Sequence, residues 1–336
     1  MKKVFADSIS KNTDKEILQY AVGALLYTPG GNKEIAKVIC AKKYEYLTSV
    51  SLCLEDAIAD NAVEMAEKQV ISSLSQINDA ISNNEIREDE LPLIFIRVRS
   101  PEQLERLFPK IHKFEKVLTG FVLPKFDLSN ANRYKKIILE INNGSRYYAM
   151  PTLETESIIN ISTRVDVLLR LKEIIDSISQ FTLNIRVGGN DFCNQFGLRR
   201  SCKETIYDIA LVKDTIIDIF NIYGRDYVVS GVVWEYFDNN GEDKWRTGLE
   251  KELSLDRLNG FIGKTAIHPS QLQIIANAMK VSTENYEDAK NILNWDNDFL
   301  GVAKSSKGNR MNESKVHTNW ANRIIRLAHI YGVSES

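Results

Sequence analysis

Two carboxylates follow neighbouring apolar runs near the middle of the chain. Asp191 follows an alternating run that begins at Asn184 and ends in two glycines, and Glu154 follows a run that begins at Tyr147. Both runs have the pattern of strands that end in a carboxylate. Hard divalent cations prefer a few carboxylate oxygens together with water and substrate oxygens. The two runs therefore predict a divalent-metal site at one edge of a sheet.

Other polar residues also stand at or just past the ends of predicted strands. They are Pro29 and Gly30, Glu55 and Asp56, Arg97 and Arg99, Lys125, and His268. In a parallel α/β barrel the C-terminal ends of the strands carry the chemistry. Taken singly, each is also explained as a turn residue or a surface ion pair, and for Lys125 a salt bridge is the alternative to a substrate contact. For His268 we favour a structural role beside Pro269.

The elements that position these residues alternate short apolar runs with longer amphipathic ones. The predicted strands cover residues 24–28, 49–54, 93–98, 120–123, 147–150, 182–187, 227–233 and 265–267. Ser100 and Pro101 look like the N-cap and first residue of a helix. Eight strand–helix units with fully apolar strands predict a parallel (β/α)8 TIM barrel. A doubly wound open sheet is the structural alternative.

Composition places the chain among ordinary globular proteins. It has 336 residues, 43% of them hydrophobic and 26% charged, and a net charge of -2. We therefore expect no nucleic-acid or anionic-membrane partner. No apolar run approaches the ~20 residues that span a bilayer. The four cysteines lack CxxC spacing and residues 1–8 lack the apolar core of a secretory signal, so we expect a cytoplasmic protein.

The barrel accounts for residues 1–270, and residues 271–336 form a predicted C-terminal extension. A capped helix begins near Val281, a loop rich in Gly, Ser and Lys covers 301–312, and residues 313–331 again have helical periodicity. We expect this extension to be helical.

Seven motifs in order carry a resemblance to a known family. They are Leu26 to Gly30, Leu52 to Ile58, Ile96 to Arg99, Val122 to Lys125, Leu153 to Thr155, Gly188 to Asp191 and Gly263 to Gln271. Together they resemble the citrate lyase beta-subunit-like proteins of the HpcH/HpaI aldolase group, which are TIM-barrel carbon–carbon lyases. The resemblance runs from about residue 24 to the C-terminus.

The resemblance implies roles for the residues at the strand ends. Glu154 and Asp191 would hold a magnesium ion, with substrate oxygens completing its shell, and Arg97 would bind and polarise those oxygens. Such an arrangement stabilises the enolate left by cleavage beside a hydroxyl group. Glu55 and Asp56 would orient metal-bound water or share in proton transfer, and a capped turn is the alternative for this pair.

Further residues are candidates for substrate binding. Gly30 begins a Gly-Gly-Asn segment that suits an anion at a helix N-terminus, although a plain turn explains it equally well. Arg199 and Arg200 follow Asp191 closely and are suited to grip a carboxylate or phosphate, or else to pair with surface acids. We include Pro29, Arg99 and Lys125 in this substrate-binding set.

The resemblance also implies a role for the tail. In relatives the tail resembles a lid that covers a neighbouring subunit's site and supplies an acidic residue after a Gly-x-x-Met segment. Here that segment begins at Gly308, and Glu313 stands where the family usually has aspartate. A general base is one interpretation of Glu313, and an acid in the first turn of a helix is the other. The resemblance favours a homo-oligomer, with a trimer as the expected form.

Two departures from the family pattern bear on the substrate. The family commonly has Arg-Ser where this chain has Gly23 and Ala24, and aspartate where it has Cys53. We therefore expect a magnesium-dependent aldol- or Claisen-type lyase acting on a beta-hydroxy acid or a hydroxyacyl thioester, with a small carboxylate or acyl-CoA-like substrate. A hydroxyacyl-CoA thioesterase or synthase on the same scaffold is one alternative, and a non-catalytic metabolite-binding or assembly subunit is another.

Overall fold

The predicted parallel barrel is present. The computed structural model describes residues 9–238, 243–296 and 299–334, so the N-terminal segment examined for a signal lies outside the described residues. Within these ranges one sheet has the strand order β6-β5-β4-β3-β2-β1-β7, and every pairing in it is parallel. Its strands are β1 (Ala24–Pro29), β2 (Ser49–Cys53), β3 (Leu93–Arg97), β4 (Leu118–Leu123), β5 (Tyr148–Leu153), β6 (Arg186–Val187) and β7 (Lys264–Ala266).

Residues 227–233, expected as a regular strand, close the barrel through isolated pairs instead. Val229 pairs with Ile185 on one side, and Gly231 pairs with Lys264 of β7 on the other, both in parallel. A β-carbon on Gly231 would lie 2.6 Å from Asp256 Oδ2, so glycine is required where this segment crosses that acid. The segment does not form the regular strand that was predicted. It does lie between β6 and β7, and with the seven strands of the sheet it completes a ring of eight.

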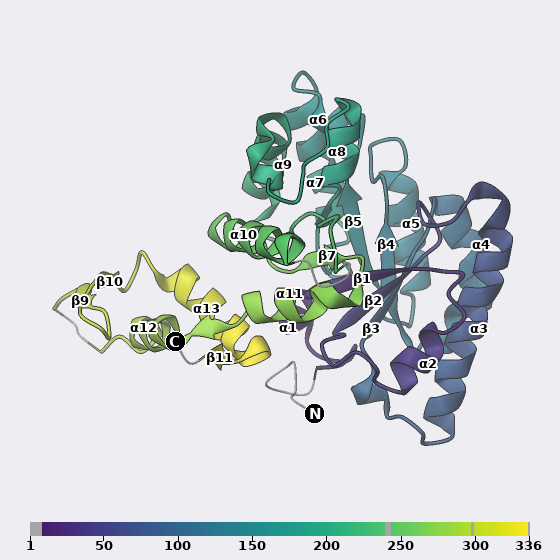
Figure 1. The fold of residues 1–336 in the computed structure, drawn as a ribbon, viewed down its shortest axis with the longest axis horizontal. Coiled ribbons are helices and arrows are strands. Elements are labelled where there is room, and N and C mark those ends of the chain that lie inside the picture. Colours follow the sequence, from purple (N-terminus) through teal and green to yellow (C-terminus); the bar gives the residue numbers. More distant parts are fainter. Residues whose placement is uncertain (1–8, 239–242, 297–298, 335–336) are drawn as a thin grey trace.

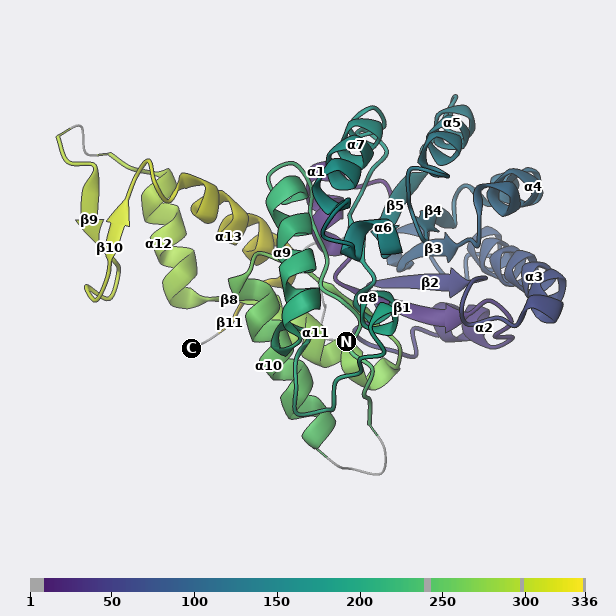
Figure 2. The ribbon, with the colours of Figure 1, turned by 90° about the horizontal axis from the view of Figure 1, so that it is seen from above.

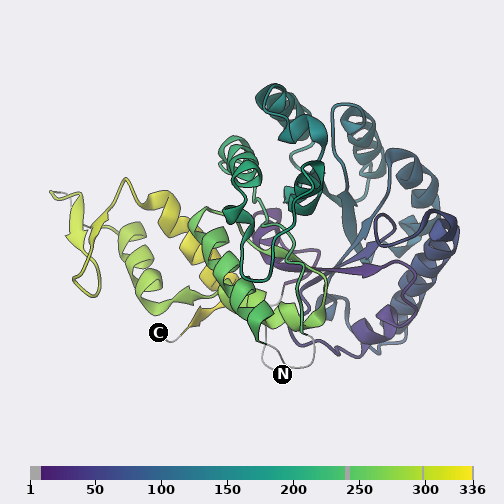
Figure 3. The same cartoon turned by 45° about the horizontal axis from the view of Figure 1, so that its top comes forward.

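Helices surround the strands on the outside (Figure 3). These are α2 (Ile35–Cys40), α3 (Val63–Ser82), α4 (Pro101–Ile111), α5 (Ala131–Ile141), α6 (Glu156–Ile159), α7 (Arg164–Asp176), α8 (Gly189–Gln195), α9 (Ala210–Tyr223), α10 (Lys244–Leu258) and α11 (Leu272–Ala278). The predicted cap of α4 is confirmed, because the Ser100 side chain accepts a hydrogen bond from the Gln103 backbone N–H. No helix in the described ranges is both long enough and apolar enough to cross a bilayer.

Alternation along the strands separates two apolar layers. On β3, Ile94 and Ile96 belong to the outer core with the surrounding helices, whereas Leu93 and Phe95 belong to an inner core. Because side chains alternate along a strand, Arg97 shares the inward face with Leu93 and Phe95. The apolar inner core therefore gives way to polar side chains toward the C-terminal ends of the strands.

The opposite end of the barrel is closed by helices from both ends of the chain. These are α1 (Lys15–Ala21), which the sequence did not predict, α12 (Thr283–Leu293) and α13 (Thr318–Tyr331). Leu25 and Phe95 inside the barrel share one apolar cluster with Leu18 of α1 and Ile330 of α13. The Tyr331 hydroxyl donates a hydrogen bond to the Tyr20 carbonyl oxygen at 2.7 Å. The extension thus contributes to the bottom of the barrel, away from the strand ends that carry the acids.

Beyond α12 the chain forms an arm. The predicted loop over 301–312 is wrong in part, because β9 (Val302–Lys304) and β10 (Met311–Glu313) pair in antiparallel fashion. All three residues of β9 are exposed, so the segment lacks the apolar alternation that identifies a strand in sequence. The helix that follows starts at Thr318 rather than 313. Two short strands, β8 (Val281–Ser282) and β11 (Val333–Ser334), pair beside α12. Figures 1 and 2 show the β9–β10 arm at the end of the molecule far from the barrel.

Candidate active site

A cavity of about 520 Å³ opens where the strands end. Its walls come from the C-terminal ends of β1, β2, β3, β5 and β6, from the segment that follows Gly231, and from β7. Among its lining residues are Tyr27, Arg97, Glu154, Arg186, Asp191 and Arg199. This is the rim on which the sequence placed its candidate residues, and it is where barrel enzymes carry their chemistry.

Arg97 contacts three of the acids at the rim. Its Nη2 lies 2.8 Å from Glu55 Oε2, 3.1 Å from Asp56 Oδ2 and 3.5 Å from Glu154 Oε1. The guanidinium stacks over the ring of Tyr27 at 5.4 Å. The residue is buried, and its Nε has no partner among the described residues. Arg97 is therefore held from several sides while one nitrogen stays available for a ligand.

Glu55 and Asp56 form a coupled acid pair with Lys125. Lys125 Nζ contacts Glu55 Oε1 and lies 3.3 Å from Asp56 Oδ1. Burial, assisted by a hydrogen bond with Asp56, raises the pKa of Glu55. For Asp56 burial acts in the same direction, but the hydrogen bond with Glu55 and the charges of Arg97 and Lys125 outweigh it and bring its pKa to about 2. Asp56 is therefore the stronger acid of the pair, and it presents an anion to the cavity.

The turn after β4 fixes one oxygen of Glu154. Lys125 has a positive φ of 47°, which a non-glycine residue adopts rarely. Its carbonyl oxygen accepts a hydrogen bond from Asn130 Nδ2 at 2.8 Å, and its backbone N–H donates to Glu154 Oε1 at 2.8 Å. The side chain of Lys125, predicted to contact substrate, is committed to the acid pair, as in the salt-bridge alternative.

Glu154 and Asp191 converge as the sequence predicted. Gly188 lies between them: a β-carbon there would collide with the Glu154 carboxylate and lie 3.1 Å from Asp191 Oδ2. Burial raises the pKa of Glu154 to about 8, and the negative charge of Asp191 adds to this shift although Arg97 opposes it. Burial likewise raises the pKa of Asp191. Two carboxylates this close in a buried place favour a proton or a cation between them.

The donor set suits magnesium. In the described part of the chain, no three His, Cys, Asp or Glu side chains gather in an arrangement suited to a metal ion. Magnesium is commonly held by one or two carboxylates, with water and substrate oxygens as its other ligands. One oxygen of Glu154 is already hydrogen-bonded to Lys125, which leaves Oε2 and the Asp191 carboxylate as the oxygens that would hold the ion.

The predicted substrate-binding residues separate into two groups. Pro29 and Arg199 line the cavity, and Arg199 Nε pairs with Glu235 at 3.1 Å. Gly30 is not part of the cavity lining, and its N–H donates to the Cys53 carbonyl oxygen at 2.7 Å. Arg99 pairs with Asp60 at 2.8 Å and is not part of the cavity lining.

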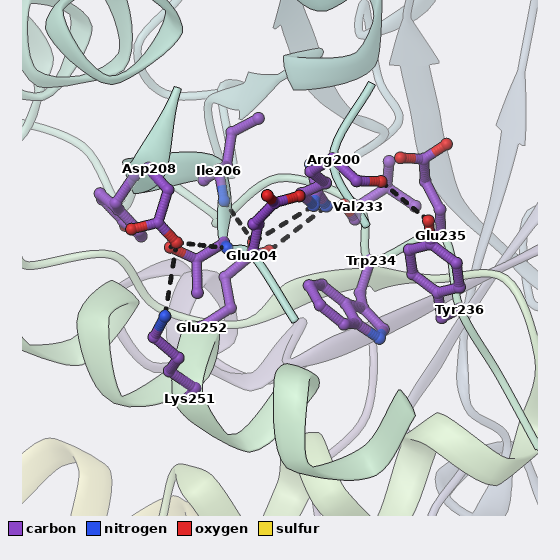
Figure 4. Close-up of polar contacts among 12 residues, drawn as sticks. Arg200, Glu204, Ile206, Asp208, Val233, Trp234, Glu235, Tyr236, Lys251 and Glu252 are labelled. Atoms are coloured by element: carbon purple, nitrogen blue, oxygen red, sulfur yellow. Dashed lines mark hydrogen bonds and ion pairs between the residues drawn. The ribbon is translucent and has the colours of Figure 1, made fainter. Parts of the chain in front are cut away.

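Arg200 is not among the residues that line the cavity. It is buried, its Nη2 donates to the Val233 carbonyl oxygen, and its Nε lies 3.4 Å from Glu252 Oε2 (Figure 4). Its guanidinium stacks over the Trp234 ring at 5.2 Å. The Tyr236 hydroxyl donates to the Arg200 carbonyl oxygen at 2.8 Å. These contacts anchor the segment after β6 against α10, and they do not bring Arg200 together with the acids.

Glu313 and His268 also lie outside the cavity lining. Glu313 ends β10 on the arm, so this chain does not bring it to its own barrel mouth (Figure 1). Its role stays a prediction that requires another subunit. His268 accepts a hydrogen bond from the Ser270 backbone N–H at 3.2 Å and stacks on Phe237, contacts that fit the structural role we favoured.

The sequence reasoning missed several residues of the cavity. Tyr27, Arg186, Glu235 and Thr265 all line it. Arg186 had a detectable signal, because it is a charged residue inside an otherwise apolar strand pattern. In the structure its neighbours Ile185 and Val187 belong to the outer core, which leaves Arg186 on the inward face.

The structure is a closed parallel TIM barrel with an arginine and two convergent acids at its C-terminal rim, the end at which TIM-barrel enzymes carry their active sites. The model of the family "C-C bond lyase of the TIM-barrel fold" matches residues 16–333. The chain belongs to this family and is a carbon–carbon lyase of the citrate lyase beta and citramalyl-CoA lyase type.

Individual relatives are distant. Human mitochondrial citramalyl-CoA lyase is 24% identical over 281 residues, which cover 80% of this chain and 74% of that protein. A crystal structure of a citrate lyase from Burkholderia xenovorans LB400 matches with a TM-score of 0.65 at 14% identity, over 94% of this chain and 93% of the other. CitE from Mycobacterium tuberculosis, in complex with magnesium, acetoacetate and coenzyme A, matches with a TM-score of 0.58 at 17% identity, over 93% and 99%. Such likenesses establish the fold.

Proposed function

We propose that this lyase is magnesium-dependent and cleaves a beta-hydroxy acid or a hydroxyacyl thioester by an aldol- or Claisen-type reaction. The observation that carries the proposal is the convergence of Arg97, Glu154 and Asp191 on one cavity. Citramalyl-CoA lyase among the curated relatives, and magnesium in the CitE complex, agree with this choice.

The reaction breaks the carbon–carbon bond next to the hydroxyl-bearing carbon. The hydroxyl group loses its proton and becomes a carbonyl, while the electron pair of the broken bond forms an enolate that is then protonated. A magnesium ion held by Glu154 and Asp191 would supply positive charge that stabilises the enolate oxygens. Arg97 contributes a fixed positive charge in a buried setting, where such charges act more strongly than in water.

The Glu55–Asp56 pair is suited to proton transfer. Asp56 lines the cavity, and Glu55 lies behind it against Arg97 and Lys125. The pKa of Glu55 is raised and that of Asp56 is lowered, so Glu55 is the better proton acceptor of the two. We assign this pair to moving a proton at the substrate, with Lys125 holding the two acids in place.

The two departures from the family pattern bear unequally on the choice between a hydroxy acid and a thioester. Gly23, which replaces the family's arginine, lies at the bottom of the barrel beside Tyr331 and not at the cavity, so its expected bearing on the substrate was wrong. Cys53 lines the cavity with its sulfur 3.9 Å from Arg97 Nη1, where the family has an acid. Of the two departures, only Cys53 lies where it can contact the substrate.

We also propose that the extension acts between subunits. Five large apolar side chains of the arm are exposed: Phe299, Leu300, Val302, Met311 and Val316. A homo-oligomer, a trimer by family resemblance, would bury them and bring Glu313 to a neighbour's barrel mouth as a candidate general base. The expected cytoplasmic location stays a prediction.

Calorimetric titration of magnesium tests the proposed function. We expect the metal-free protein to bind magnesium, and binding to tighten in the presence of pyruvate or oxaloacetate, because a keto acid presents oxygens like those of the enolate. Asp191→Ala should weaken magnesium binding at least tenfold and lower turnover at least a hundredfold. The matched control is Asp60→Ala, which removes an exposed acid paired with Arg99 outside the cavity.

Two results would contradict the proposal. One is a wild type that binds no magnesium; the reaction would then not depend on this metal. The other is an Asp191→Ala variant that retains full turnover. Product analysis addresses the remaining alternative, since a thioesterase releases an acid and coenzyme A without breaking a carbon–carbon bond.

A further inference from the structure

Arg186 is a buried cation that faces the cavity without an anionic partner. It is 2% exposed and lies on β6, between two residues that belong to the outer core. Its Nη2 donates a hydrogen bond to Thr265 Oγ1, and Tyr27 is its other polar neighbour. Its Nε and Nη1 have no partner among the described residues. Burial lowers the pKa of Arg186, but an arginine begins so far above neutrality that it stays charged.

Other buried arginines of this chain are partnered quite differently. Arg164 donates to the carbonyl oxygens of Ile158 at 3.1 Å and Ile159 at 2.8 Å and pairs with Asp218 at 2.9 Å. Arg97 contacts three carboxylates. In the described part of the chain, no acid forms an ion pair with Arg186. An unpaired buried charge destabilises the fold, so its presence beside a cavity points to a ligand that supplies the opposite charge.

We propose that Arg186 binds a second carboxylate of the substrate. This inference rests on the proposed function, in which the first acid group or carbonyl of the substrate lies at Glu154, Asp191 and Arg97. Arg186 and Thr265 line the same cavity as those residues. The Thr152 hydroxyl, which lines the cavity as well, has no partner among the described residues and adds a further hydrogen-bonding group. The substrate class is then a compact dicarboxylate hydroxy acid.

Charge decides between a carboxylate and a phosphate. The single positive charge of Arg186 balances the single negative charge of a carboxylate. A phosphate or phosphonate dianion would add a second negative charge to a cavity wall that already contains Asp56, Glu154 and Asp191. The charges that line the cavity therefore favour a carboxylate over a phosphate.

Three keto acids that differ at one end test the assignment. Pyruvate lacks the second anionic group, oxaloacetate carries a carboxylate, and phosphonopyruvate carries a phosphonate in the same place. We expect the magnesium-loaded protein to bind oxaloacetate at least tenfold more tightly than pyruvate. In Arg186→Met this preference should disappear, while the affinity for pyruvate changes less than about threefold. A preference that persists in the variant, or phosphonopyruvate binding more tightly than oxaloacetate, would overturn the assignment.

A stability measurement shows whether Arg186 serves the fold instead. Without ligand, Arg186→Met should raise the melting temperature, because it removes an unpaired buried charge and keeps the volume. The matched variant Arg164→Met should lower it, because that arginine is fully partnered. A fall in melting temperature for Arg186→Met would mean that the arginine is structural and would refute the inference.

Succinate separates this inference from the proposed lyase function. It has two carboxylates but no keto group, and it can be tested in the presence of EDTA. Succinate should raise the melting temperature of the wild type but not that of Arg186→Met. If this holds while keto acids show no magnesium-dependent binding, the proposed magnesium dependence fails and the anion site stands. If succinate protects both proteins equally, the anion site fails whatever the metal does.

Discussion

Glu154 shows how burial prepares a side chain for a cation. Its carboxyl group is 4% exposed and lies beside Asp191, with Gly188 leaving room between them. The resulting pKa of about 8 means that the metal-free protein takes up a proton where the loaded protein would hold a metal ion. A magnesium ion bound in the proposed way at these two acids would therefore release a proton.

The first prediction concerns the pH dependence of stability in the metal-free protein. Between about pH 4.5 and pH 8 the folded state keeps a proton on Glu154, whereas the unfolded chain has lost it. Because the folded state binds more protons, its stability falls as the pH rises through this window. Denaturant titrations at several pH values should show a slope of up to about 1.4 kcal/mol per pH unit from this group.

Glu154→Gln is the control for this pH effect. The amide is neutral at every pH, so the variant should lose this contribution and give a flatter profile. An equal slope in the variant and the wild type would assign the effect to other groups. Saturating magnesium should also flatten the wild-type profile, because the cation replaces the proton.

At the scale of elements, the turn from β6 into α8 determines whether the acids meet. Gly188 caps α8, and Asp191 lies in its first turn. The backbone of Gly188 has a φ of -92°, which any residue adopts, so glycine is needed there for space and not for conformation. The two carboxylates can approach each other only because Gly188 has no side chain.

The second prediction is that Gly188→Ala disrupts the site. The added methyl group meets the Glu154 side chain, so the two acids must separate, and magnesium affinity should fall at least tenfold. Calorimetric titration measures this directly. Gly31→Ala is the matched control, because a β-carbon there meets nothing within 4 Å. Unchanged magnesium affinity in Gly188→Ala would show that the acids do not act together.

Most of the barrel and its acid edge could be predicted from the sequence, for a physical reason. Strands buried on both faces give apolar runs, and polar residues that interrupt such runs at their ends mark the rim. Glu154, Asp191 and Arg97 were found in this way, and the structure brings them together. The assigned roles of the predicted site residues stay predictions.

Other features depend on partners that a sequence does not display. Arg186 lies within the sequence of a strand. Only the three-dimensional structure shows that its side chain faces the cavity and that no acid of the described residues pairs with it. Arg200 looked like a second ligand for substrate because it follows Asp191 closely, but Glu252 from α10 pairs with it. The pairing of β9 with β10 leaves no apolar pattern, because β9 is exposed along its length.

At the scale of the whole molecule, the candidate active site and the apolar closure lie at opposite ends of the barrel. The acids line the mouth, whereas α1, α12 and α13 share an apolar cluster with the inward residues at the other end of the strands. Stability and chemistry should therefore respond to different substitutions.

The third prediction tests this separation. Ile330 is fully buried in the cluster at the bottom. Ile330→Ala should lower the free energy of unfolding by about 2–5 kcal/mol, while the turnover number of the folded enzyme stays within about twofold. Denaturant unfolding and initial-rate kinetics provide the two measurements. Ile161→Ala, at a position that is 85% exposed, is the control that should change neither. A turnover number that falls in step with stability would show that the two ends are coupled.

The bottom closure also has a consequence for synthesis on the ribosome. Helix α1 emerges first and α13 last, yet both complete a single apolar cluster with the inward strand residues. Translation of the intervening chain takes roughly tens of seconds. Throughout that interval the nascent barrel exposes the apolar surface that α13 will cover, and exposed apolar surface of this kind makes an unfinished chain prone to aggregation.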